Sequence, residues 1–412
     1  MIRILVAGCL LLVSFFPSVA ADKEEEKATR LAEALKNGTF KVDLRYRYEG
    51  VDDDGIALRG EASTLRTAIG YRSASFHGFR AAFQVEHVTD VGLSSKHANA
   101  GAGSLSNGVM GRPVIADPEV TEVQQAYLEY RGDEDFGLAV GRQEISVGDH
   151  RFIGSVPWRQ NYQSFEAVRL DLKAIPRTKV LYAFLDRSNR INGGEWDQES
   201  HILDVAIKAC KKGTVTPYYY VQDFDMQRSG LSASTATVGA RWEATEEAGG
   251  WKIPYHLEYA QQSDAGDNPN DLDANYHRVS VAGHRGGLRL KIAYEMLGGD
   301  LTDGKFETPQ ATLHKFNGWA DRFLRTPDNG LTDLAATVGW VWSERKVNAA
   351  LTFHQFGADS AGPDHGSEFD GIVGWKSPWG QSFHAKFAVY RADTLDTLED
   401  VTKFWVWSGY SF

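Results

Sequence analysis

The stretch FKVDLRYRYEG, residues 40–50, alternates between two kinds of side chain. One set is apolar or aromatic, and the other is fully charged: Lys41, Asp43, Arg45, Arg47 and Glu49. A period of two over residues 40–49 predicts an extended strand with two opposite faces. The fold then depends on what covers the apolar face, a protein core or some other apolar medium.

Both ends of the chain carry features of an exported protein. Residues 1–20 combine Arg3, an apolar run and a small-residue cleavage site, which predicts a secretory signal peptide. Residues 21–37 follow as a short charged segment that we place in the periplasm. The last strand has aromatic residues at alternate positions and ends in Tyr410-Ser411-Phe412. We expect Phe412 and Tyr410 to be the signal that the outer-membrane assembly machinery reads.

Amphipathic segments of about ten residues recur through the rest of the chain. Eighteen can be counted, near 40–49, 63–72, 78–89, 121–130, 136–145, 165–173, 177–187, 200–210, 213–223, 234–243, 252–262, 273–284, 287–296, 331–342, 346–356, 367–376, 379–391 and 402–412. The connections alternate between short turns, such as 377–378, and long polar loops: 90–120, 146–164, 188–199, 263–272, 297–330, 357–366 and 392–401. This alternation is typical of bacterial outer-membrane barrels.

A single series of amphipathic strands offers no second layer to cover an apolar face. Closing residues 38–412 into a barrel puts the apolar face against lipid and the charged face in the lumen. A charge at the bilayer midplane on the lipid face costs about 2–4 kcal/mol, so Arg45 and Arg47 must point inward. We therefore predict an all-β fold, a transmembrane antiparallel up-and-down β-barrel of about 18 strands with short periplasmic turns and long extracellular loops.

Two stretches carry a resemblance to a known family. ADPEVTEVQQAYLEY (116–130) and GRQEISVGDHRFIGSVPWRQNYQSFEAV (141–168) resemble the alginate export porin family, and the first strand is similar to that of the family. The resemblance implies a monomeric outer-membrane barrel of eighteen strands. It leaves the solute open, because a shared fold carries over better than a shared substrate.

Basic side chains of the early strands are the candidate solute contacts. On the strands we expect Arg45, Arg47, Arg66, Arg142 and Arg169 to line the pore, with Asp43 and Asp171 as acidic partners. The 146–164 connection is expected to fold into the barrel and to contribute Arg151, Arg159, Gln160 and Asn161; packing against the rim is the alternative. Arg142 shares the register of Val140, so we expect a bulge at Gly141 to turn it inward.

These features predict passive passage of anionic or polar solutes, with sugar acids or uronate oligomers as the favoured class. Basic and acidic candidates on the inward face are similar in number, so a general porin of low selectivity is the alternative. A barrel enzyme of the lipase or deacylase type is a further alternative. The chain has no Gly-x-Ser-x-Gly and no His-Glu-x-x-His, and Cys210 is its only cysteine beyond the signal peptide.

The expected surroundings follow from the barrel. Partners are the lipid bilayer, lipopolysaccharide, the barrel assembly machinery and a carbohydrate solute, with no nucleic acid. We expect a monomer in the outer membrane of a Gram-negative bacterium, with no catalytic site, no metal site and no cofactor. The acidic runs at 52–54 and 264–273 are interpreted as solvated loops, with divalent-cation binding as the alternative.

Overall fold

The computed structural model describes residues 29–132, 135–209, 213–225, 233–301, 304–394 and 397–412. Within them, 18 strands form one antiparallel sheet. The strands are β1 (Thr39–Asp53), β2 (Gly60–Arg72), β3 (Phe79–Lys96), β4 (Val120–Arg131), β5 (Phe136–Gln143), β6 (Ser164–Leu172), β7 (Thr178–Asn189), β8 (Glu195–Ile207), β9 (Gly213–Gln222), β10 (Thr235–Ala248), β11 (Trp251–Asp264), β12 (Asp273–Arg285), β13 (Leu288–Leu297), β14 (Leu331–Trp342), β15 (Val347–Gly357), β16 (Gly366–Lys376), β17 (Ser382–Ala392) and β18 (Val401–Ser411). The predicted fold class and strand number are confirmed.

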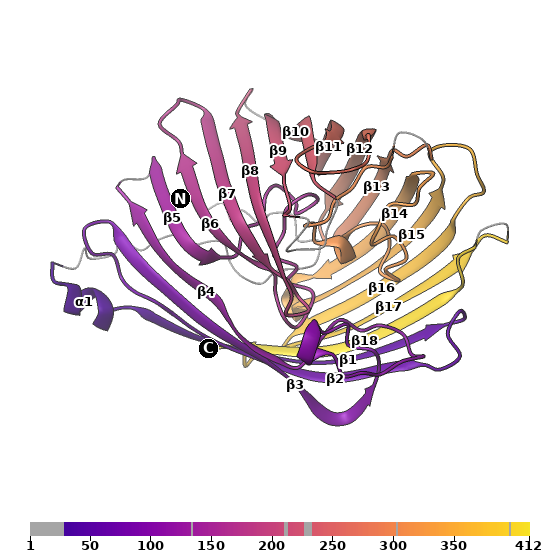
Figure 1. The fold of residues 1–412 in the computed structure, drawn as a ribbon, viewed down its shortest axis with the longest axis horizontal. Helices are drawn as coiled ribbons and strands as arrows, with labels where there is room; N and C mark the ends of the chain where they lie inside the picture. The colour runs from indigo at the N-terminus through magenta and orange to yellow at the C-terminus, as the bar shows by residue number, and fades with distance from the viewer. Residues whose placement is uncertain (1–28, 133–134, 210–212, 226–232, 302–303, 395–396) are drawn as a thin grey trace.

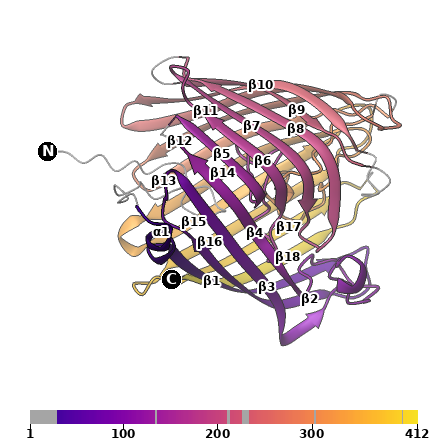
Figure 2. The same cartoon turned by 60° about the vertical axis from the view of Figure 1, so that its left-hand side comes forward.

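The sheet closes on itself, because β1 pairs with β2 on one side and with β18 on the other. Asp43, for example, lies opposite Ala68 of β2 and opposite Ser411 of β18. Figures 1 and 2 show the indigo first strands beside the yellow last strands. Closure gives every strand of this sheet a partner on both sides, which is what a β-structure in lipid requires.

The two faces of β1 settle which side meets lipid. Arg47 and Glu49 are each only 1% exposed, and their side chains bond to groups inside the ring. Apolar side chains stand on the opposite face all round the barrel, for example Ile292 at 59% and Leu351 at 54% exposed to the surroundings. The apolar face therefore meets the membrane and the charged face lines the interior.

Aromatic side chains gather where the short turns lie. Their rings contact one another in pairs: Phe79–Tyr130, Trp340–Trp342, Trp375–Trp379 and Tyr410–Phe412. Such girdles sit at the membrane–water interface of outer-membrane barrels. They mark the short-turn end of this barrel as one interface.

Two predicted connections are wrong in extent. The 188–199 loop shrinks to 190–194, because β7 continues to Asn189 and β8 already begins at Glu195. An ion pair of 2.6 Å between Arg187 and Asp197 joins these polar extensions, which lack the apolar alternation used for prediction. β3 likewise runs to Lys96, past the expected start of the 90–120 loop.

The N-terminal segment is partly described. The predicted signal peptide, 1–20, lies outside the described residues, and helix α1 (Leu31–Lys36) precedes β1. Ala34 is buried there, and the Tyr71 hydroxyl donates to the carbonyl of Leu35. No helix among the described residues is long and apolar enough to span a membrane.

Candidate functional site

The connection between β5 and β6, residues 144–163, lies inside the ring of strands. Arg151 bonds Glu295 of β13 at 2.8 Å, and Arg159 reaches Glu49 of β1 at 3.2 Å. These two wall residues belong to distant strands, so the segment crosses the lumen. Its tip is buried, with Trp158 5% exposed.

A second connection, the described residues 298–301 and 304–330 between β13 and β14, also folds inward. His314 accepts a hydrogen bond from Lys386 of β17 at 2.7 Å, and Asp321 pairs with Lys403 of β18 at 2.7 Å. The two inward segments touch, since the Gly154 amide donates to the Gln310 carbonyl at 2.9 Å. Sequence reasoning missed this segment. Its length and its aromatic, histidine and asparagine content, similar to 150–161, were the available signals.

Arg45, Arg47 and Arg66 meet on the lumen side of β1 and β2. Arg45 and Arg66 stand directly opposite each other in the strand register. Tyr162 of the first inward segment lies between them, with its ring centroid 4.2 Å from the Arg66 guanidinium and 5.5 Å from that of Arg45. Trp158 stands 5.0 Å from the Arg47 guanidinium. We call Arg45, Arg47, Arg66 and Arg159 the arginine cluster.

Carboxylates pair with three members of the arginine cluster. Arg66 binds Glu86 and also Asp43, the latter at 3.0 Å. Arg47 binds Asp117, and Arg159 binds Glu49 at 3.2 Å and Asp321 at 3.4 Å. Alternation along the strands already places Glu49 and Glu86 on the lumen face, whereas Asp117 lies on a loop and was not predicted. The pairing of Asp117 with Arg47 and of Glu49 with Arg159 joins residues far apart in the chain, so no local pattern predicts it.

Two acids that come from loops, Asp117 of the β3–β4 connection and Asp321 of the second inward segment, remain ionised. Burial by itself would raise the pKa of Asp117, but Arg47 and Arg159 outweigh it and hold the pKa at about 2. For Asp321, burial is likewise outweighed, by His314, Lys403 and Arg159, and its pKa falls well below the usual value. Three guanidinium groups here meet five carboxylates, so the paired part of the arginine cluster carries no net positive charge at neutral pH.

Arg45 differs from its neighbours. Its Nε donates to Oε1 of Gln160 at 2.7 Å, Nη1 donates to the Pro157 carbonyl at 2.8 Å, and Nη2 donates to the Arg159 carbonyl. All three acceptors are neutral oxygens, and no ion pair of Arg45 occurs in the described part of the chain. A guanidinium carries five N–H donors, so two remain for a solute.

Other predicted residues lie away from this cluster. Asn161 is buried and donates to the carbonyls of Arg190 and Ile191. Arg169 pairs with Asp171 at 2.9 Å. Arg151, on the far side, also reaches Asn317 of the second inward segment at 3.2 Å. The predicted set thus divides into several places rather than one belt.

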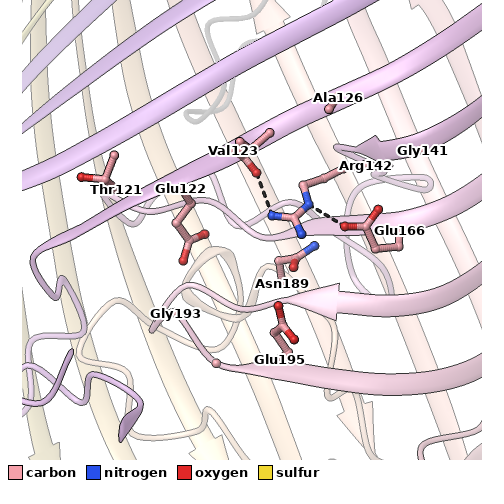
Figure 3. A pocket seen from close by; sticks show the side chains of 11 residues that line it. Thr121, Glu122, Val123, Ala126, Gly141, Arg142, Glu166, Asn189, Gly193 and Glu195 are labelled. Atoms are coloured by element: carbon pink, nitrogen blue, oxygen red, sulfur yellow. Dashed lines mark hydrogen bonds and ion pairs between the residues drawn. The ribbon is translucent and has the colours of Figure 1, made fainter. Parts of the chain in front are cut away.

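The expected inward turn of Arg142 does not occur. Pairing runs through Gly141 without a register shift on both sides, so Arg142 stays on the face of Val140. There it binds Glu166 at 2.6 Å and the Val123 carbonyl at 2.9 Å (Figure 3). This position is near the end of β5, where the outward face carries polar side chains and a charge has a partner.

Comparison with known proteins agrees with this geometry. The sequence model named "Alginate export" matches residues 37–296. The chain belongs to the alginate export family. It is an outer-membrane β-barrel of the porin type, from a Gram-negative bacterium. No curated protein matches the chain in sequence.

Several solved porin structures share the fold. OccK9 (OpdG) of Pseudomonas aeruginosa is 13% identical with a TM-score of 0.72, over 92% of this chain and 99% of that one. OccAB2 of Acinetobacter baumannii is 13% identical with a TM-score of 0.71, over the same shares. OpdK of P. aeruginosa, solved with vanillate, is 12% identical with a TM-score of 0.68, over 92% and 100%. At 12–13% identity, these similarities show a shared fold and leave the solute of this chain open.

Proposed function

We propose that this barrel is a channel for passive diffusion of anionic or polar solutes, with sugar acids and uronate oligomers as the favoured class. The observation that carries the proposal is Arg45. It is partly buried on the lumen face, its side-chain hydrogen bonds in the described structure go to neutral oxygens, and two of its donors remain for a carboxylate. An arginine can grip a carboxylate with two parallel hydrogen bonds.

The arrangement of Arg45 and Arg66 supports the same reading. Like charges directly opposite each other in a sheet are destabilising. Two arginines nevertheless face each other here, and only Arg66 has carboxylate partners. Membership in the alginate export family and the vanillate, an aromatic carboxylate, in the OpdK structure are consistent with an anionic solute.

A general porin of low selectivity is the second candidate. The observation that favours it is the pairing of Arg47, Arg66 and Arg159 with carboxylates, which leaves little net positive charge around the inward loops. Charge selectivity then depends on Arg45 alone within the arginine cluster. The two candidates therefore differ in what happens when Arg45 is changed. We assign no catalytic role, since the matching family and the similar structures are channels.

Planar-bilayer recordings under a salt gradient test the proposal. The wild type should be anion-selective, and uronate oligomers should block its current. Arg45→Gln should move the reversal potential toward that of the cation and weaken block roughly fivefold, since a unit charge at ~4 Å contributes about 1 kcal/mol in water. Arg45→Lys retains the charge and should retain selectivity.

Arg187→Gln is the matched control, because Arg187 stands across from Glu166 in the outward register and pairs with Asp197. Arg187→Gln should leave both the reversal potential and the block by uronate oligomers unchanged. If the wild type is cation-selective, or if the Arg45→Gln channel behaves like the wild type, the anion-selective proposal fails. The general porin of low selectivity then remains as the function.

A further inference from the structure

The barrel wall has a notch at the loop end of β5. β5 pairs with β4 only from Arg131–Gly137 to Ala126–Arg142, and then the chain leaves the wall as the first inward segment. In the described structure, β4 residues 120–125 pair with β3 alone. β6 pairs with β7 as far as Ser164 and Asn189, and the chain then turns through 190–194 into β8. A gap therefore remains above the end of β5, between β4 on one side and β6 with the 190–194 turn on the other.

A cavity of about 560 Å³ fills this notch, in the size range of small-ligand sites. Its lining includes Glu122, which stands opposite the buried lumen residue Glu86. It also includes Ala126 and Arg142, which stand in the outward register with Leu128 and Val140. Residues from both faces of the sheet line one space, so the cavity passes through the wall. We call it the wall cavity.

A loop contact closes the upper side of the wall cavity. The Ala102 amide donates to the Asn192 carbonyl at 2.9 Å, and the Asn192 side chain donates to the Ala100 carbonyl at 3.2 Å. This brings the β3–β4 connection against the 190–194 turn, whose Gly193 and Gly194 line the cavity. The opening is thus framed on all sides by protein.

The lining of the wall cavity is acidic. Glu122, Glu166 and Glu195 line it together with Arg142, and Arg187 pairs with Glu195 at 3.4 Å from beside the lining. Three carboxylates and two guanidinium groups leave one negative charge. Arg142 is already engaged with Glu166. This charge is opposite to what a uronate needs, and it favours a cationic group.

A second observation points to a ligand. Asn189 is 4% exposed and lines the wall cavity, yet its Nδ2 has no hydrogen-bond partner. Figure 3 shows the side chains of Asn189, Arg142 and Glu195 at the same opening. A buried donor without an acceptor costs about 1–3 kcal/mol, which a bound oxygen atom recovers.

We propose that the wall cavity binds a hydroxyl-bearing organic cation, such as an amino sugar. The ammonium group pairs with the carboxylates of Glu166 and Glu195. A hydroxyl oxygen of the same ligand accepts the hydrogen bond from Nδ2 of Asn189. This site is separate from the lumen path of the proposed function and has the opposite charge preference.

Three sugars with the same ring test this site: glucosamine, glucose and glucuronate, at a pH where the amine is protonated. Binding to the purified full-length barrel in detergent is followed by calorimetry or by saturation-transfer NMR. Glucosamine should bind saturably at the wall cavity, and neither glucose nor glucuronate should compete for it. Asn189→Leu and Glu195→Gln should each weaken glucosamine binding by about fivefold or more, as loss of a ~1 kcal/mol contact requires.

Glu243→Gln is the matched control for Glu195→Gln. Both glutamates have a similarly exposed side chain and a long arginine contact, and Glu243 lies on β10, away from the wall cavity. Glu243→Gln and Arg45→Gln should leave glucosamine binding unchanged, which separates this site from the lumen function. Heat-modifiable gel migration verifies that each variant folds. Binding that is absent, or that is equal in wild type and both cavity variants, overturns the proposal.

Discussion

The indole of Trp158 lies flat against the imidazole of His314, with ring centroids 4.5 Å apart and an interplanar angle of 8°. Trp158 belongs to the first inward segment and His314 to the second, so this stack joins the two loops inside the lumen. Trp405 and Trp407 of β18 meet the Trp158 ring edge-on at 5.7 and 5.3 Å. This stack therefore joins both loops to each other and to β18, in addition to the hydrogen bond between Gly154 and Gln310.

Trp158→Ala should loosen both inward segments. Truncating a buried tryptophan typically costs about 3–5 kcal/mol, and here the loss falls on loop docking rather than on the strands. We expect a larger and noisier single-channel conductance with unchanged heat-modifiable migration. Trp379→Ala, at an exposed site beyond the lumen, is the control. A conductance identical to wild type would show that Trp158 does not hold the loops in place.

Acidification should have a similar effect through His314. Its Nδ1 donates to Asp321 at 2.6 Å and its Nε2 accepts from Lys386, so a second proton would face an ammonium group. Burial, then Lys386 and Arg159, lower the pKa of His314 well below its usual value, although Asp321 opposes them. Just below pH 6.5, the His314 imidazole is protonated when the loop is unfolded but stays neutral when the loop is docked. Stability is therefore full above about pH 6.5 and falls as the pH drops through that value.

Conductance noise recorded from about pH 7.5 to about pH 5 measures this dependence. Noise should rise on the acid side in the wild type, and His314→Gln should reduce its slope in this window. The remaining slope is expected from His150 of the first inward segment, because burial, with Lys315, lowers its pKa to about 4. The lowered pKa of Asp321 acts only below its unfolded value of about 3.9, outside the window. His87→Gln, on the outward face, is the control. A profile that persists unchanged in His314→Gln would exclude His314 as its source.

The orientation of the barrel can be tested on intact cells. Asn270 is exposed on the long connection between β11 and β12, and Glu344 is exposed on the short turn between β14 and β15. In a Cys210→Ser background, Asn270→Cys should react with an impermeant thiol reagent and Glu344→Cys should not. Both should react after the outer membrane is permeabilised. Reaction of Glu344→Cys alone would invert the topology.

The C-terminal residue should matter for assembly more than for stability. Phe412 follows β18, and its backbone exchanges hydrogen bonds of 2.8 and 3.0 Å with Val42 of β1. Deleting Phe412 should reduce the amount of protein in the outer membrane and raise the protease-sensitive periplasmic fraction. Phe412→Tyr keeps an aromatic ring and should insert normally. Full insertion of the deletion variant would show that another signal suffices.

The strands could be predicted from the sequence because their evidence is local. Alternation such as that of Leu288, Leu290 and Ile292 against Arg289 and Lys291 fixes both the strand and its faces within a few residues. The short turns then predict that strands consecutive in the chain are neighbours in the barrel. Strand ends were less predictable, since polar extensions such as Glu195–Glu199 lack an apolar face.

The lumen contacts could not be predicted, because they join residues far apart in the chain. Arg47 and Asp117 are 70 positions apart, and Arg159 and Asp321 are 162 apart. Alternation along a strand predicts which arginines and carboxylates face inward, but it does not predict which of them pair with each other. The prediction for Arg142 was wrong for a different reason. Gly141 has a φ of 124°, which favours glycine, but the strand register continues through it without a bulge. The presence of a glycine alone therefore did not indicate a bulge.

The pairing of β1 with β18 has a consequence for how the chain is made. The seam joins Asp43 to Ser411, so it cannot form until the ribosome has delivered almost the whole sequence. Until then the first strand keeps a row of unsatisfied amides and carbonyls, and contacts of such long sequence separation form slowly. The nascent barrel must therefore cross the periplasm as an open, aggregation-prone sheet or as an unstructured chain. Until β18 arrives, we expect β1 to be the edge at which the chain is most prone to aggregate.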